Sequence, residues 1–132
     1  MRKLVAPLLL PMLVALSPAT QAAQMSEAER SALQAAMVQH IDRQTIDGFY
    51  LNVDLADGQV MKYSPAKSHP MMLRLGDNYV LCTDFKGADG KSATVDFYVA
   101  RKGKSYSVFK TEIANRAPLE KLMQTGKVTP VE

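Results

Sequence analysis

The fold is decided by residues 79–113, YVLCTDFKGADGKSATVDFYVARKGKSYSVFKTEI, which predict three consecutive antiparallel strands with one shared apolar face. Pairing the first two strands across the turn at 86–91 places nearly all the large side chains on one side. The facing pairs are Phe85 with Ala93, Thr83 with Val95, Leu81 with Phe97, and Tyr79 with Val99. A second turn at Lys102-Gly103 predicts a third strand, with Tyr106 opposite Val99. We expect the core to include Leu81, Phe85, Val95, Phe97, Val99 and Val108.

The opposite side of these strands, which we call the mixed face, carries apolar and polar side chains together. Its residues are Val80, Cys82, Asp84, Thr94, Asp96, Tyr98, Ser107 and Phe109. Any function carried by the sheet is expected here. The candidate ligand-binding residues are Cys82, Asp84, Asp96 and Tyr98.

A long helix is predicted before the sheet. Ser26 and Glu29 have the capping-box spacing, in which each side chain satisfies a backbone amide at the start of a helix. A mainly apolar stripe follows at helical spacing, formed by Leu33, Ala36, Met37, His40, Ile41 and Gln44. It ends before Asp47-Gly48, where the glycine favours the left-handed conformation that closes a helix. Such a stripe needs a sheet to cover it.

The next two segments, 49–55 and 59–63, predict a β-hairpin whose turn decides which residues face inward. A two-residue turn at Asp57-Gly58 would mix the two faces. A three-residue loop with Gly58 left-handed keeps one face apolar, because it pairs Val53 with Met61 and Leu51 with Tyr63. The outer face would then be a solvated surface formed by Tyr50, Asn52, Asp54 and Lys62.

The remaining elements are short. Pro65 and Pro70 interrupt the crossover that follows the hairpin, and a brief strand is predicted over residues 71–75. A second helix is predicted over residues 118–124, because a proline at its start and a glycine after its end are typical helix boundaries. Residues 127–132 are expected to form a loose tail.

This order of elements predicts an α+β domain: one long N-terminal helix packed on a curved four- to five-stranded antiparallel sheet, with a short C-terminal helix. In topology the chain resembles the cystatin-like group of folds, which includes the cystatins and the nuclear transport factor-like proteins. The resemblance covers residues 26–113 and implies one long helix wrapped by antiparallel strands. It carries over no functional residue, because the cystatins' glutamine-valine-x-valine-glycine loop has no convincing match here.

The first 22 residues predict a secretory signal peptide. Arg2 and Lys3 precede an apolar run over residues 4–16, and small residues follow, as a signal peptidase requires. The apolar run is shorter than the roughly 20 residues that a membrane-spanning helix needs, so a membrane anchor is the less favoured alternative. We therefore expect a periplasmic or secreted protein that has no membrane attachment after residues 1–22 are removed.

Residues 23–132 are expected to form a single α+β domain, with a core over about 26–126. The composition, 47% hydrophobic and 22% charged, is that of an ordinary globular protein. Two units of the formal net charge of +3 come from Arg2 and Lys3, and no basic run has the aromatic spacing that favours nucleic-acid binding. The single cysteine, Cys82, excludes an internal disulfide, so stability must come from a packed core.

Cys82 is the only thiol, and the predicted register places it opposite Asp96. A nucleophilic cysteine needs a stabilised thiolate, whereas a neighbouring carboxylate raises the thiol pKa. A half-buried structural cysteine is therefore the favoured interpretation.

Acid–base chemistry by Asp84 and Asp96, with Tyr98 as proton donor, is the alternative. Asp96 is equally well explained as an exposed strand residue.

The sequence also contains candidate ligands for copper(I). His69, Met71 and Met72 lie close together, with His40 and Met61 elsewhere in the chain, and imidazole and thioether ligands suit this ion. The spacing is not specific to a metal. His40 lies on the helical stripe and Met71 alternates with apolar residues, as core residues would. We therefore expect neither a metal nor another cofactor.

The sequence predicts a small exported, non-catalytic binding module for an unknown protein or small-molecule ligand, such as an inhibitor or an assembly factor. Its site would lie on the mixed face or on an exposed sheet edge. The alternative is a small-molecule-binding protein or an enzyme, with a pocket between the sheet and the C-terminal helix. Self-association through the sheet into a homodimer is a third alternative.

Overall fold

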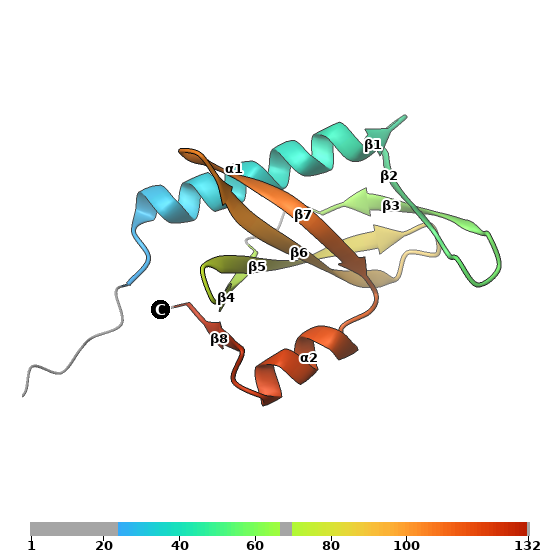
Figure 1. The fold of residues 1–132 in the computed structure, drawn as a ribbon. Helices are drawn as coiled ribbons and strands as arrows, with labels where there is room; N and C mark the ends of the chain where they lie inside the picture. Colours follow the sequence, from blue (N-terminus) through green and yellow to red (C-terminus); the bar gives the residue numbers. More distant parts are fainter. Residues whose placement is uncertain (1–23, 67–69, 132) are drawn as a thin grey trace, which may run out of the picture.

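The computed structural model describes residues 24–66 and 70–131, so the predicted signal peptide and His69 lie outside the described residues. Figure 1 shows the arrangement of the elements. They are α1 (Glu27–Gln44), β1 (Thr45–Ile46), β2 (Phe49–Val53), β3 (Val60–Pro65), β4 (Met71–Leu75), β5 (Asn78–Gly87), β6 (Ser92–Lys102), β7 (Ser105–Ile113), α2 (Ala117–Gln124) and β8 (Val128–Pro130). The predicted α+β class, with a helix on an antiparallel sheet and a short C-terminal helix, is confirmed. Within these described ranges the sheet has eight strands, more than the four to five expected.

The sheet is organised around β5. Along one side β5 pairs with β6, which in turn pairs with β7. Along the other side β5 has two neighbours: β4 pairs with its first half, and β3 pairs only with its last residues. β8 extends the sheet beyond β4, and β2 and β1 extend it beyond β3. Two groups of strands therefore lie along the same side of β5. We call them the β1–β2–β3 arm and the β4–β8 arm.

The registers of the three central strands test the predicted pairing. All four predicted pairs between β5 and β6 are confirmed. In β7, Tyr106 lies opposite Arg101 and Val108 opposite Val99, so the predicted register is wrong by two residues. The turn consists of Gly103 and Lys104, one position later than predicted. Because side chains alternate with a period of two, this error leaves Tyr106 and Val108 on the expected face.

α1 covers one face of the sheet and α2 covers part of the other, which gives three layers (Figure 1). α1 packs on the predicted apolar face through its buried side chains Leu33, Ala36, Met37 and Ile41. The core residues Leu81, Phe85, Val95, Phe97 and Val99 are fully buried there. Val108 is partly buried against the same cluster. The opposite face has a second apolar cluster, formed by Leu73, Val80, Cys82, Tyr98, Leu119 and Val128.

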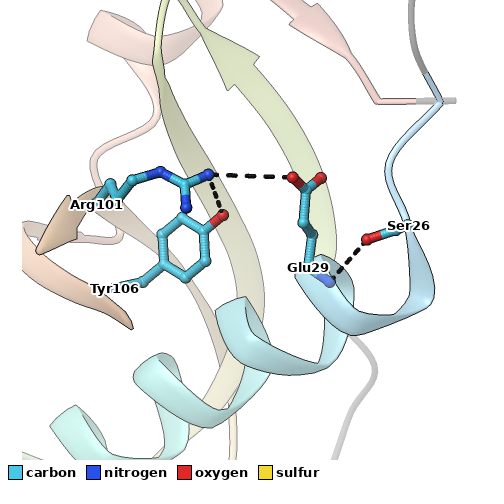
Figure 2. Close-up of polar contacts among 4 residues, drawn as sticks. All are labelled: Ser26, Glu29, Arg101 and Tyr106. Atoms are coloured by element: carbon cyan, nitrogen blue, oxygen red, sulfur yellow. Dashed lines mark hydrogen bonds and ion pairs between the residues drawn. The ribbon is translucent and has the colours of Figure 1, made fainter. Parts of the chain in front are cut away.

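The ends of α1 differ in detail from the prediction. Ser26 caps the helix as expected, because its Oγ accepts a hydrogen bond from the Glu29 backbone amide at 3.1 Å. The Glu29 carboxylate lies 4.0 Å from Arg101 Nη2, and this guanidinium donates a hydrogen bond to the Tyr106 hydroxyl (Figure 2). After Gln44, which is exposed, Asp47-Gly48 forms the turn between β1 and β2 instead of closing the helix.

The β2–β3 hairpin has a different register from the one predicted. Val53 lies opposite Val60 and Tyr50 opposite Tyr63, so the predicted pairing is wrong by one residue. Gly58 is left-handed as expected, with φ of 74°. A one-residue shift turns every side chain of β2 to the other face. Tyr50 is therefore buried in the core, 5.2 Å from Phe85 between ring centroids, rather than on a solvated surface.

The C-terminal segment is ordered rather than loose. β8 pairs with β4 through Val128, Thr129 and Pro130, and Val128 is buried in the second apolar cluster. Two backbone hydrogen bonds close α2 before this strand: the Lys127 amide donates to Leu122 and the Gly126 amide to Met123. The predicted tail is therefore an edge strand, which a three-residue pattern could not reveal from the sequence.

Candidate functional site

The mixed face is covered at one end and open at the other. α2 and β8 cover the end that carries Cys82, Asp96 and Tyr98, all of which are buried. Leu119 of α2 is fully buried against this end. Apolar side chains therefore fill the layer in which the alternative hypothesis places a pocket.

Asp84 belongs to the open end. Its side chain is exposed and accepts a hydrogen bond from Thr94 Oγ1 at 3.2 Å. The structure thus brings together three of the four candidate residues, Cys82, Asp96 and Tyr98, and separates the fourth from them. The pair of carboxylates considered for acid–base chemistry is divided between the two ends of the face.

Asp96 forms a buried ion pair that the sequence did not predict. Only 1% of its surface is exposed, so the interpretation as an exposed strand residue is wrong. Its Oδ1 lies 3.4 Å from Arg116 Nη2, and the same nitrogen lies 3.4 Å from Cys82 Sγ. Arg116 is the residue just before α2, and Ala114, with φ of 51°, lies in the bend that leads to it. In the sequence, Arg116 is marked only by its position at the predicted start of the second helix.

These contacts decide the chemistry of the thiol. Burial raises the pKa of Cys82 to about 12, and the Asp96 carboxylate adds to the rise, which outweighs the opposite effect of Arg116. The pKa of Tyr98 is also raised, first by burial and then by Asp96. Both groups therefore keep their protons near neutral pH. The cluster suits a structural connection between α2 and the sheet better than nucleophilic or acid–base chemistry.

We expect Cys82 in the folded protein to react with iodoacetamide near neutral pH at least about a hundredfold more slowly than in the urea-unfolded chain. The reason is that the thiolate is the reactive form and both burial and the raised pKa suppress it. Mass spectrometry of timed samples measures the labelling, with Cys82→Ala as the blank. Equal rates in the two states would contradict the buried thiol.

The same pKa shift predicts a loss of stability at alkaline pH. The pKa of Cys82 in the folded protein lies above its ordinary value of 9.0, so the folded form keeps its proton longer. The stabilisation is complete below pH 9 and is lost as the pH rises through about 12. Urea unfolding across this range should show a smaller alkaline loss for Cys82→Ala than for the wild type.

The candidate metal ligands do not come together in the described part of the chain. Met71 is exposed, whereas its neighbour Met72 is buried on the opposite face of β4, with its Sδ 3.8 Å from Arg30 Nη1. His40 Nε2 lies 3.2 Å from the Tyr50 hydroxyl. Burial, and then the charge of Arg43, lowers the pKa of His40. Among residues 24–66 and 70–131, no three His, Cys, Asp or Glu side chains form a group that could hold a metal.

The open end of the mixed face continues onto the β1–β2–β3 arm, where it becomes apolar. We define the hairpin patch as Ile46, Phe49, Leu51, Val53 and Val60. Ile46 lies opposite Phe49, and Val53 lies opposite Val60, so these side chains are neighbours on one face. Four of the five are between 39% and 57% exposed, and Leu51 is partly buried. Lys62, opposite Leu51, holds its ammonium 5.6 Å from the centre of the Phe49 ring.

Sequence reasoning missed the hairpin patch because it assigned Leu51 and Val53 to the core. The signal was nevertheless present in the sequence. Segment 49–55 has aromatic or aliphatic residues at both its odd-numbered and its even-numbered positions, so some of them must face outward. The preference for an apolar interior favours the set with Phe49, Leu51 and Val53, which is the set that faces outward. The pairing of Tyr50 with Tyr63 shows which set faces the core.

Comparisons with known proteins give no relative: no family model, no curated protein and no solved structure matches this chain. They therefore add no support to the cystatin-like resemblance. No helix among the described residues is long and apolar enough to cross a membrane.

Proposed function

We propose that the protein is a non-catalytic binding module that holds a partner protein on the hairpin patch. The observation that carries this proposal is the exposure of Ile46, Phe49, Val53 and Val60 on one continuous sheet face. Soluble proteins rarely leave contiguous apolar side chains open unless the surface binds something. An aromatic residue among aliphatic ones is also the usual composition of the centre of a protein interface.

Two further observations support binding over catalysis. The Lys62 side chain borders the patch and its ammonium lies over Phe49, as a polar rim residue would around an apolar centre. The polar groups buried under α2 keep their protons or are engaged in the Asp96–Arg116 ion pair. Export to the periplasm or beyond remains part of the proposal, and it rests on the pattern of the first 22 residues alone.

Site-specific photo-crosslinking tests the proposal. A photoreactive benzoylphenylalanine at Val53 should give a discrete crosslinked product in the producing cells, whereas the same residue at Lys104, exposed in the β6–β7 turn, should give none. Adding Phe49→Lys should reduce the product at least about tenfold, because removal of a central aromatic residue costs about 2 kcal/mol or more. Equal products from both positions, or none from Val53, would contradict the proposal. The purified protein alone shows whether the partner is a second copy.

A further inference from the structure

The edge of β3 beside the hairpin patch is unpaired over part of its length. The β3–β5 ladder contains only Tyr63, Ser64 and Pro65, whereas β3 pairs with β2 over residues 60–63. Within the described part of the chain, residues 60–62 therefore have no ladder partner on the side away from β2. An unpaired strand edge is a template for another strand.

The hydrogen-bond pattern of the hairpin shows which backbone groups are free. The Asp54 amide donates to the Gln59 carbonyl at 2.8 Å and so closes the ladder at the hairpin loop. Because facing pairs in an antiparallel ladder alternate between bonded and non-bonded, the next pair, Val53 with Val60, is non-bonded. The N–H and C=O groups of Val60 and Lys62 thus point away from β2, toward the free side.

A hollow lies on that free side. It has a volume of about 470 Å³, which is within the range of peptide- and ligand-sized sites. The β3 edge forms one wall, and the turn between β5 and β6 with the first residues of β6 forms the other. Met61 and Ala93 are apolar lining residues. It exists because β5 turns away after Gly87, whose amide donates to Lys91, while β3 continues without it.

The charge around the hollow is positive. Lys62 and Lys91 both line it and are exposed. The one carboxylate among the lining residues, Asp89, is engaged in its own turn, where Oδ1 accepts the Lys91 amide at 2.9 Å. Asp89 also folds over Gly87, since a Cβ there would lie 2.9 Å from Oδ1. Among the described residues neither lysine is in an ion pair. The exposed contact of the Lys62 ammonium with the Phe49 ring is weak and can be exchanged for an incoming anion.

We propose that the β3 edge and this hollow bind an extended acidic peptide segment by strand addition. The segment would pair with the free N–H and C=O groups of Val60 and Lys62. Its alternate side chains would then point to opposite faces, apolar ones onto Met61 and Ala93 and acidic ones beside Lys62 and Lys91. This site shares Val60 with the hairpin patch, but it uses the backbone of Val60 whereas the patch uses the exposed side chain. Lys91 belongs to the edge site alone and Ile46 to the patch alone, so variants at these two residues test the sites separately.

Fluorescence anisotropy with a labelled peptide of alternating glutamate and valine tests this inference. The peptide should bind the wild-type protein, and Lys62→Glu combined with Lys91→Glu should raise its Kd at least about tenfold. Val60→Pro should do the same, because it removes an edge amide that the β2–β3 ladder does not use. Circular dichroism verifies that each variant is folded. Raising the salt from about 50 to about 200 mM should weaken the binding.

Matched controls distinguish binding at this site from non-specific electrostatic attraction of the acidic peptide and from binding at the hairpin patch. Lys104→Glu, a charge reversal in the β6–β7 turn, and Ile46→Lys, on the patch but across β2 from the edge, should each leave the Kd within about twofold. No binding of the glutamate peptide would overturn the inference. Equal binding of a lysine–valine peptide, or of a peptide with prolines at alternate positions, would overturn it as well.

Discussion

The variant Phe97→Asp is expected to be unfolded under conditions in which the wild type is folded. Phe97 is fully buried, with the rings of His40, Tyr50 and Phe85 between 5.6 and 6.5 Å away. Loss of a buried phenyl ring costs about 3–5 kcal/mol. An unpaired carboxylate in its place adds several kcal/mol more, and the total is comparable to the whole stability of about 5–15 kcal/mol.

Far-ultraviolet circular dichroism and a urea titration measure this effect. The matched control is Phe109→Asp, which puts the same substitution at a side chain that is 57% exposed. Its free energy of unfolding should fall by only about 1–2 kcal/mol, because the exposed ring loses its contact with Tyr98, 6.3 Å away between centroids, and aspartate is unfavourable in a strand. A cooperative transition for Phe97→Asp with a midpoint near that of the wild type would show that Phe97 does not lie in the core.

The part of the fold that contains Phe97 was the part that the sequence predicted best. Along β5 and β6 most of the large apolar residues alternate with smaller or polar ones, and a glycine-rich turn joins the two strands. One register puts these large residues on the same face and also fits the turn. Local sequence also predicted the start of α1, because Ser26 acts within one turn of the helix. In both cases the deciding interactions lie close together in the chain.

The hairpin was mispredicted because its local pattern favours the wrong register. Phe49, Leu51 and Val53 are apolar, yet Tyr50 is inward, between the rings of Phe85 and His40. The Tyr50 hydroxyl also finds a partner in His40, 3.2 Å away, which a buried tyrosine needs. This partner lies on α1, and no periodicity within β2 could reveal it. The mistaken register is the reason that the hairpin patch was not predicted.

The candidate site was predicted only in part for a similar reason. The sequence placed Cys82 opposite Asp96, and the structure agrees. It could not show that α2 folds back over this pair, because that contact joins Arg116 to a strand about twenty residues earlier. The burial of Asp96 and of the Cys82 thiol, and with it the raised pKa of the thiol, follows from the packing of α2 on this end of the sheet.

Replacement of Arg116 by alanine is accordingly expected to destabilise the domain by about 2–3 kcal/mol. Breaking a fully buried ion pair costs about 3–5 kcal/mol, because the remaining charge is left without a partner. We expect the smaller loss of about 2–3 kcal/mol because 35% of the Arg116 side chain is open to water, which screens the ion pair. The free energy of unfolding from urea titrations near neutral pH measures the loss.

A double-mutant cycle with Asp96→Asn shows whether the ion pair is the cause. Asp96→Asn alone should cost less, about 1 kcal/mol, because the partly exposed Arg116 can still reach water whereas Asp96 cannot. With asparagine at position 96, the removal of Arg116 leaves no buried charge without a partner. In this background Arg116→Ala should therefore lower the free energy of unfolding by less than about 1 kcal/mol. If Arg116→Ala costs the same in both backgrounds, its effect comes from the packing of its side chain and not from its charge. The asymmetry between the two single variants would show that the buried carboxylate depends on α2, and that α2 closes this end of the mixed face by supplying its counter-charge.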